Sequence, residues 1–252
     1  MMTLTIAGGI ATLTLSHPPV NAISDAFITR FNAVLDDLDK RSDWKILHLR
    51  SDQKVFCAGA DLKEVGARFN ASDSCKLTHR FVVRLQQLFD RIERLPQVTL
   101  AEIGGAAMGG GLELALACDL RIIALDAKLG LPEARLGLIP GAGGTQRLTR
   151  LCGRPTASRL IFGAETIAGA DALWLGIVQW AVAADEVATF AAEIAEKIAS
   201  LSAAALRACK SCIAAACESG GTGFLAEIEE TRRLSTNPET RARVSAFLAG
   251  QR

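Results

Sequence analysis

The hydrophobic period of this sequence switches repeatedly between two residues and about 3.6 residues, and this switching constrains the fold more than any other feature. In residues 10–16, apolar and hydroxyl side chains alternate as in a half-buried strand, and residues 3–7 are expected to pair with it in a hairpin. Apolar residues over 27–38 then share one helical face, and Ser24 stands where it can cap that helix. A strand at 45–50 completes a strand-helix-strand unit.

The same alternation continues through the middle of the chain. It predicts a helix at 77–94, a strand at 98–103, a short helix opening near Gly110 and a strand at 120–124. Strands separated by helices usually pair in parallel, so we expect an α/β fold with parallel pairing. Residues 66–75 are rich in small and turn-forming types, and we expect a mobile loop there.

The C-terminal quarter has a helical pattern, and its strand signal fades. Four helices are predicted, at 187–198, 203–217, 223–235 and 238–249. Gly220-Gly221 and Asn237-Pro238 separate the last three of them. Because such short helices are unstable alone, we expect them to cover the core or a neighbouring subunit.

Charge and composition narrow the function. The 252 residues include 28 Lys plus Arg and 27 Asp plus Glu, so the net charge of +1 provides no field that attracts nucleic acid or an anionic membrane surface. No apolar run reaches the roughly 18 residues that a membrane-spanning helix needs. The first basic residue is Arg30, unlike in a secretory signal, and we expect a cytoplasmic protein. The seven cysteines, among them Cys57, Cys118 and Cys217, lack framework spacing and are expected to be free thiols.

Several conspicuous side chains have structural interpretations. The segment Cys209-Lys210-Ser211-Cys212 lies in an alanine-rich helix without a second cysteine pair or a nearby histidine, so we expect no metal there. The three histidines, His48 among them, fall in no motif and are expected at the surface or in loops. Trp174 and Trp180 are expected in the core or at subunit contacts.

Three glycine clusters stand out, and none of them is a phosphate loop. No Gly-Lys-Ser/Thr follows a cluster, and no G-x-G-x-x-G follows a strand with an acid about twenty residues further on. In the middle cluster a helix opens near Gly110, so the N–H of Gly110 is expected to point outward at the positive end of a helix dipole. Such a donor can stabilise a carbonyl oxygen that becomes negative. The alternative is a tight strand-to-helix connection without further function.

Two acids follow the middle cluster. Glu113 lies near the first turn of an apolar helix, where desolvation raises the pKa of a carboxyl towards the range of general acid–base catalysis. Glu133 follows Pro132, which can open a helix. A structural role at a helix start is the alternative for each acid, and Glu113 would then bond the amides of its own helix. If both face one site, a carboxylate and a carboxylic acid can share one water.

The first cluster repeats this arrangement. Gly59 permits a ligand to approach the backbone closely, and the N–H of Ala60 is free at the entry of a helix. Ala60 is therefore a second candidate donor to a carbonyl oxygen. Asp61 is interpreted as the cap of that helix.

Taken together, these segments resemble the enoyl-CoA hydratase/isomerase (crotonase) superfamily over nearly the whole chain. The resemblance rests on ordered motifs at compatible spacing, namely Phe56-Cys57-Ala58-Gly59-Ala60-Asp61-Leu62, Met108-Gly109-Gly110-Gly111-Leu112-Glu113-Leu114-Ala115 with Cys118-Asp119, and Gly130-Leu131-Pro132-Glu133 with Ile139-Pro140-Gly141-Ala142-Gly143-Gly144-Thr145-Gln146-Arg147-Leu148. Three such motifs in order are far more specific than a single glycine cluster.

The resemblance implies a crotonase-like spiral of ββα turns with the active site over residues 1–195. It implies a helical C-terminal trimerisation region over 196–252, and a homotrimer or a dimer of trimers. The implied substrate is an acyl-CoA thioester whose carbonyl oxygen sits between two backbone N–H groups, which match Ala60 and Gly110. Coenzyme A enters as part of the substrate, and no metal or other cofactor is implied. Residues implied to contact the thioester and coenzyme A are Ala22, Ala58, Ala60, Asp61, Leu62, Lys63 and Gly110.

The two glutamates of the family's hydratases match Glu113 and Glu133. The resemblance therefore implies an enoyl-CoA hydratase that adds water across the 2,3 double bond of 2-enoyl-CoA to give 3-hydroxyacyl-CoA, in fatty-acid or branched-acyl degradation. We expect Glu113 to act as the base and Glu133 to donate the C2 proton. An enoyl-CoA isomerase, or another acyl-CoA lyase or hydrolase, is the alternative on the same fold. A non-catalytic acyl-CoA- or RNA-binding protein is the alternative of another class, and the near-neutral charge disfavours RNA.

Overall fold

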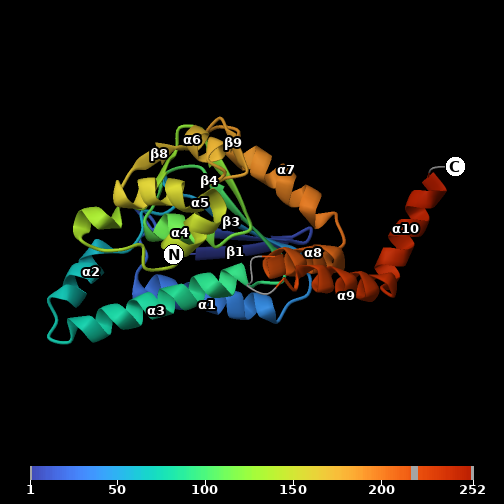
Figure 1. The fold of residues 1–252 in the computed structure, drawn as a ribbon, viewed down its shortest axis with the longest axis horizontal. Coiled ribbons are helices and arrows are strands. Elements are labelled where there is room, and N and C mark those ends of the chain that lie inside the picture. The colour runs from blue at the N-terminus through green and yellow to red at the C-terminus, as the bar shows by residue number, and fades with distance from the viewer. Residues whose placement is uncertain (1, 217–220, 251–252) are drawn as a thin grey trace.

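A computed structural model describes residues 2–216 and 221–250. The main sheet has the strand order β1-β2-β3-β4-β6-β9 and lies at the centre of the molecule (Figure 1). Its strands are β1 (Met2–Ala7), β2 (Ile10–Leu15), β3 (Ile46–Ser51), β4 (Val98–Ile103), β6 (Leu120–Ala124) and β9 (Trp180–Val182). The hairpin β1–β2 is antiparallel and every other pair in this sheet is parallel. The predicted hairpin, the strand-helix-strand unit and the parallel pairing are thus confirmed.

A second, smaller sheet has the order β5-β7-β8. It consists of β5 (Ala107–Met108), β7 (Lys128–Gly130) and β8 (Thr166–Ala168). The pair β5–β7 is parallel, and β7–β8 is antiparallel. The fold is therefore α/β with mixed sheets, and the second sheet carries the segments that lead into two of the glycine-rich or acidic motifs.

Helices of different lengths pack around the two sheets. They are α1 (Asp25–Asp39), α2 (Leu62–Phe69), α3 (Ser74–Glu93), α4 (Gly110–Leu116), the 3-10 helix η1 (Pro132–Leu136), α5 (Gly144–Phe162) and α6 (Gly169–Trp174). Helices α1 and α3 run side by side below the main sheet in Figure 1.

The predicted cap of α1 is confirmed, because Ser24 Oγ accepts a hydrogen bond of 3.1 Å from the N–H of Phe27. The helix then buries its apolar stripe, which includes Phe27, Phe31 and Leu35.

The expectation of a loop over residues 66–75 is correct only for residues 70–73, which form a turn, because α2 runs to Phe69 and α3 begins at Ser74. The physical reason lies in the charged side chains of α2. The guanidinium of Arg68 lies 2.5 Å from Glu64 Oε2 one turn earlier, and 2.8 Å from Asp25 Oδ2 on α1. These ion pairs stabilise a helix in a segment whose composition alone favours a turn.

The C-terminal quarter is helical, as predicted. It consists of α7 (Val187–Ala199), α8 (Ala203–Ala216), α9 (Gly223–Ser235) and α10 (Pro238–Gly250). Cys217, the last residue of one predicted helix, and Gly220 lie outside the described residues. Helix α7 packs on the main sheet through Val187 and a row of alanines, whereas α10 projects away from the rest of the molecule (Figure 1).

The division of the chain into 1–195 and 196–252 stays a prediction, and its boundary falls inside α7. Among the described residues, no single helix has the length and apolar character to cross a membrane. Only α7 and α8 together pass that test of length and composition, and the two helices meet at a bend of 103°.

One expectation for a single side chain is wrong, and another loses one of its two alternatives. His48 is buried in β3, and its Nε2 lies 2.8 Å from Glu102 Oε2 on the neighbouring strand β4. A polar partner across the ladder lets a histidine enter the sheet interior. Trp174 is 85% exposed, so it is no core residue. Its role in a subunit contact stays a prediction, while the half-buried Trp180 packs edge-on against Phe190.

Candidate active site

Three segments that are far apart in the sequence lie side by side at the site. A parallel bridge joins Cys57 to Ala107, and the β5–β7 ladder joins Ala107 to Leu129. The N–H of Met108 donates to the carbonyl of Cys57 at 3.0 Å, and the N–H of Gly109 donates to the carbonyl of Gly130 at 2.9 Å. Backbone hydrogen bonds therefore align the three motifs that the sequence analysis singled out, each just before its functional residues.

Close backbone contact at α4 requires glycine. A Cβ on Gly111 would lie 2.1 Å from the carbonyl oxygen of Cys57, which no side chain tolerates. Gly109 has a φ of 52°, a left-handed conformation that favours glycine, and a Cβ there would lie 2.7 Å from Glu133 Oε1. These glycines let α4 begin directly against the segment that contains Ala60.

The two predicted donors converge. A Cβ built on Gly59 would lie 3.2 Å from the amide nitrogen of Gly110, and one built on Gly110 would lie 3.7 Å from the amide nitrogen of Ala60. Within the described part of the chain, neither of these N–H groups donates to a protein acceptor. Two free backbone donors beside one another can bind the oxygen of a polarised carbonyl.

Both donors and both predicted acids line one cavity of about 450 Å³. The remaining wall is mostly apolar and comes from α2, α3 and the segment around η1. Its main side chains are Leu62, Val65, Arg68, Phe69, Phe81, Val82, Leu85, Met108, Leu136, Leu138 and Ile139. An apolar cavity with a few convergent polar groups is typical of a small-molecule site.

Glu113 is buried, and the alternative that it bonds the amides of its own helix is wrong. Its Oε1 accepts 2.8 and 2.7 Å hydrogen bonds from the N–H groups of Ala142 and Gly144, at the start of α5. Burial raises the pKa of Glu113 from 4.5 to about 7, against the opposing effect of the Gly144 N–H, and the nearby charge of Glu133 raises it further. A carboxyl with this pKa exchanges protons readily near neutral pH.

Glu133 lies in the first turn of η1, directly after β7. Its Oε2 is buried and has no hydrogen-bond partner among the described residues. Burial raises the pKa of Glu133, although a backbone N–H opposes this. The unpartnered oxygen belongs to a side chain that lines the cavity, so it can bind a substrate atom or a water there.

The other residues that the resemblance implied are divided between the cavity and its edge. Ala58 and Leu62 line the cavity. Asp61 caps α2, as predicted, because its Oδ1 accepts from the N–H of Lys63 at 2.8 Å. Ala22, Asp61 and Lys63 do not line the cavity, and their contact with coenzyme A stays a prediction.

Sequence reasoning missed the groups that hold Glu113. Ala142 and Gly144 belong to the third glycine cluster, Gly141-Ala142-Gly143-Gly144. Backbone N–H groups at the start of a helix have no partner within that helix, and this pattern could have identified them as donors to Glu113. It also missed Arg68 as a residue of the cavity wall, since nothing in the helical pattern distinguishes it from a solvated arginine.

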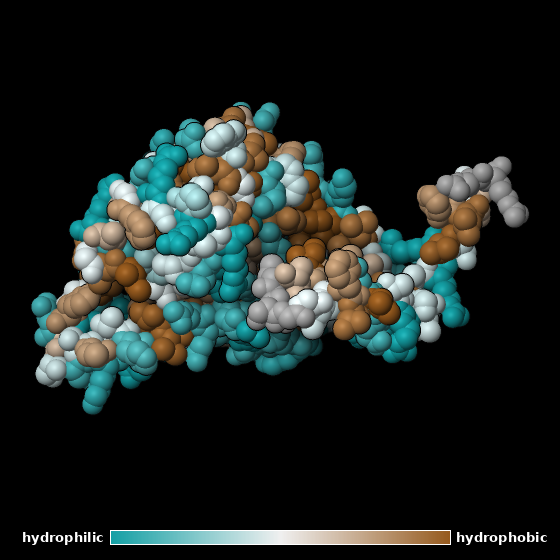
Figure 2. All heavy atoms as spheres, viewed as in Figure 1, coloured by the Kyte–Doolittle hydropathy of each residue, from teal (hydrophilic) through white to brown (hydrophobic). Residues whose placement is uncertain are grey.

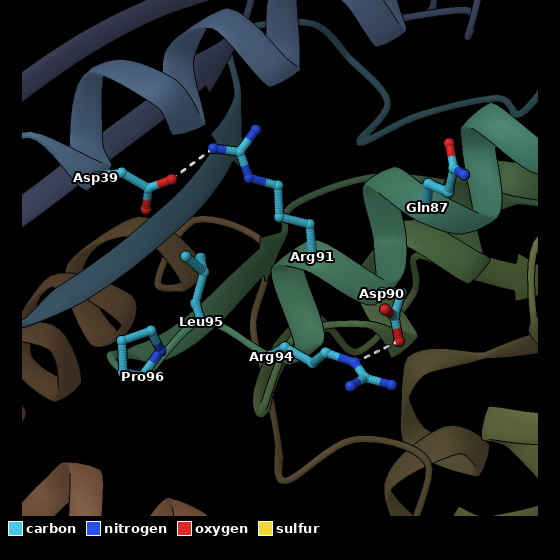
Figure 3. Close-up of a pocket in the computed structure, with 7 residues that line it drawn as sticks. All are labelled: Asp39, Gln87, Asp90, Arg91, Arg94, Leu95 and Pro96. Atoms are coloured by element: carbon cyan, nitrogen blue, oxygen red, sulfur yellow. Dashed lines mark hydrogen bonds and ion pairs between the residues drawn. The ribbon is translucent and has the colours of Figure 1, made fainter.

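A second cavity of about 390 Å³ lies between the C-terminal ends of α1 and α3 (Figure 3). Its charged side chains are already paired with one another. Arg91 contacts Asp39 at 2.6 Å and Arg94 contacts Asp90 at 2.9 Å. Its ion-paired acids are therefore poor candidates for acid–base chemistry. In the described part of the chain, no group of three His, Cys, Asp or Glu side chains could hold a metal ion.

The fold and the site define an α/β protein that can polarise a carbonyl between two backbone amides beside one buried and one half-buried acid. The chain belongs to the enoyl-CoA hydratase/isomerase (crotonase) family. The sequence model of that family, described as enoyl-CoA hydratase/isomerase, matches residues 5–245. The predicted family and the crotonase fold class are thus confirmed.

Individual relatives have the same fold or related names. A protein named "Probable enoyl-CoA hydratase" from Bacillus subtilis (strain 168) is 44% identical over 194 residues, which cover 77% of this chain and 71% of that protein. "Enoyl-CoA hydratase domain-containing protein 2, mitochondrial" from Bos taurus is 44% identical over 180 residues, or 71% of this chain, and the chain spans only 59% of its length. A crystal structure described as enoyl-CoA hydrates, from Geobacillus kaustophilus HTA426, has a TM-score of 0.93 at 34% identity, with 99% of this chain and 94% of that chain covered.

Proposed function

We propose that this protein is an enoyl-CoA hydratase that adds water across the 2,3 double bond of 2-enoyl-CoA thioesters and produces 3-hydroxyacyl-CoA. The observation that carries the proposal is that Glu113 and Glu133 line one cavity together with the free amides of Ala60 and Gly110. The hydratase names of relatives support it. A double-bond isomerase needs one acid and no water, so the second acid in the cavity favours hydration.

The two amides activate the substrate. The thioester oxygen accepts hydrogen bonds from the N–H groups of Ala60 and Gly110, which draws electrons from the conjugated double bond and makes C3 electrophilic. As water attacks, negative charge moves onto that oxygen, where the donors and the dipole of α4 already point. These interactions strengthen in the transition state and therefore accelerate the reaction.

The two acids have different roles because their surroundings differ. The pKa of Glu113 is about 7, so its carboxylate is populated at neutral pH, and two N–H groups hold Oε1 of that carboxylate; in this form Glu113 accepts the proton of the attacking water. Glu133 is half-buried, its Oε2 has no partner among the described residues and burial raises its pKa, which favours the neutral acid, so Glu133 donates a proton to C2. One O–H bond of water, one O–H bond of Glu133 and the π bond between C2 and C3 break, while a C–O bond, a C–H bond and an O–H bond on Glu113 form. Glu113 then loses this proton and Glu133 regains one by exchange with solvent before the next turnover.

The test is a panel of 2-enoyl-CoA thioesters, followed by loss of absorbance of the conjugated double bond. Glu113→Gln and Glu133→Gln should each lower kcat by about 100-fold or more and leave the Kd of a saturated acyl-CoA within a few-fold. Glu186→Gln, at an exposed site outside the cavity, is the matched control and should be unchanged. Unchanged hydration in either cavity variant would remove the two-acid mechanism. Conversion of 3-enoyl thioesters without uptake of ¹⁸O from labelled water would instead identify an isomerase.

We further propose that the chain forms a homotrimer or a dimer of trimers, and that its reaction serves fatty-acid or branched-acyl degradation. Apolar residues on the last two helices support the assembly, since Phe224 is 80% exposed and Phe247 is 66% exposed. Figure 2 displays hydrophobic residues on this projecting part of the molecule. Family membership supports an acyl-CoA substrate.

A further inference from the structure

Arg68 differs from the other residues of the cavity wall. Among the described residues that line the cavity, it is the one with a cationic side chain, and its neighbours on the wall include Val65, Phe69 and Phe81. The Arg68 side chain is only 11% exposed. A mostly buried guanidinium in an apolar wall changes what that part of the cavity can bind.

The guanidinium is fixed and neutralised. Its carbon lies 3.9 Å from the centre of the Phe81 ring, in a cation–π contact. Its Nη2 lies 2.5 Å from Glu64 Oε2 and 2.8 Å from Asp25 Oδ2. Glu64 Oε2 also accepts a 3.0 Å hydrogen bond from the N–H of Asp25, so both acids are held in place. Arg68 therefore cannot swing out of the wall without breaking two ion pairs.

The position of Arg68 along α2 relates it to the substrate. Helix α2 starts at Leu62, two residues after the donor Ala60, and Arg68 lies six residues further, or roughly 9 Å along the helix axis. Leu62, Val65 and Arg68 all line the cavity. The cavity wall thus runs from the carbonyl-binding amide along apolar side chains to a polar group.

Because apolar side chains come first along the wall and Arg68 follows, the length of the acyl chain should affect its affinity. Each methylene buried against the apolar wall should improve binding about fourfold. A methylene that reaches the guanidinium gains less, because it covers a polar group without providing a hydrogen bond. An acyl group that ends in a carboxylate gains no free partner either, since Glu64 and Asp25 already neutralise Arg68.

Resting on the proposed function, we infer that Arg68 is the specificity-determining residue of this site and selects short, uncharged acyl groups. Its stacked and ion-paired guanidinium forms the polar end of the acyl-binding part of the cavity. Arg68 takes no part in the addition of water.

The test measures binding, so that it does not depend on hydration. The dissociation constants of butanoyl-CoA and decanoyl-CoA, which cannot be hydrated, are measured by calorimetry for the wild type, Arg68→Met and Arg84→Met. Arg84 is the matched control, because it pairs with the same Asp25 and does not line the cavity. Arg68→Met should bind decanoyl-CoA at least tenfold more tightly than the wild type and butanoyl-CoA within threefold. Arg84→Met should leave the ratio of the two constants within threefold of the wild type.

Other results would overturn the inference. An equal change of the ratio in both variants would mean that the ion pairs act only on the fold, and an unchanged ratio in Arg68→Met would mean that Arg68 does not limit the chain. Arg68→Lys retains the charge and should keep the wild-type preference; a preference like that of Arg68→Met would contradict a role for the charge. Absence of hydration with every enoyl-CoA would refute the proposed function and leave these binding results intact.

Discussion

At the scale of single residues, Glu113 combines two opposing influences. Two backbone N–H groups favour its carboxylate, and burial disfavours it, with the net result that its pKa is raised to about 7. A buried acid whose charge is costly near neutral pH is a source of instability, as is common for acids in active sites. The stability of the protein should therefore depend on this one side chain.

The direction in which the free energy of unfolding changes with pH follows from the direction of this pKa shift. Since the pKa of Glu113 is raised from 4.5 to about 7, the stabilisation from its bound proton is fully present below pH 4.5 and is lost as the pH rises through 7, at a cost of order 3 kcal/mol. Glutamine keeps an acceptor oxygen for Ala142 and Gly144 but carries no charge. Glu113→Gln should thus raise the unfolding free energy relative to the wild type at pH 8.5 and change it little at pH 5, as measured by urea denaturation. Equal effects at both pH values would contradict this, and Glu186→Gln should have no effect at either.

Residue types at helix starts could be predicted from the sequence, whereas long-range partners could not. Ser24 and Asp61 act as caps within three residues of their own positions, so the local pattern suffices. The partners of Glu113 are 29 and 31 positions away. The partner of His48 lies on another strand, and only the sheet order brings it close.

At the scale of elements, the site depends on how α4 meets the segment before α2. The contact between Gly111 and the Cys57 carbonyl leaves no room for a side chain, and the two donors lie at its edge. The short α4 is buried along its whole length, so the packed side chains around it prevent it from moving to make room for an added side chain.

Gly111→Ala should therefore damage both stability and activity. The added Cβ forces α4 and the Cys57 segment apart, which we expect to cost about 2–4 kcal/mol and to lower kcat/KM by about 100-fold as the donors separate. The control is Gly66→Ala in α2, where a Cβ meets nothing within 4 Å and helix propensity improves. Thermal unfolding and hydration rates measure both effects; a Gly111→Ala protein with the properties of Gly66→Ala would refute the close-contact argument.

Most elements could be predicted because the hydrophobic period is a local property. Helix α2 is the exception: its composition favours a turn, and ion pairs with Asp25, 43 positions from Arg68, decide the outcome. The short strands β5, β7 and β8 also have too few residues for a periodic signal. Long-range contacts, which the sequence pattern does not contain, determine these parts of the fold.

At the scale of the whole molecule, the helices after α7 leave apolar side chains uncovered. Ile228 on α9 is 69% exposed and Leu248 on α10 is 57% exposed, and α10 projects away from the core (Figure 1). Such a helix gains little stability from its own hydrogen bonds. A second copy of the chain that covers this surface would account for its composition.

Charge on this surface should therefore disrupt the proposed assembly. Phe247→Asp places a carboxylate among apolar residues of α10, and we expect the main species to shift from a trimer or hexamer towards a monomer in analytical ultracentrifugation. A charge reversal at the exposed Glu193 of α7 serves as the control and should leave sedimentation unchanged. Identical sedimentation of Phe247→Asp and the wild type would show that α10 lies outside any interface.

The two groups that we propose to bind the thioester oxygen belong to the main chain at positions 60 and 110. Substitution of one side chain by another cannot delete them, provided that the local fold survives. Under the proposed function, the backbone conformation provides the activation of the thioester, and two side chains that can be substituted determine which reaction follows. Libraries that vary positions 113 and 133 should retain electrophile activation, and they offer a route to new bond-forming chemistry on the same frame.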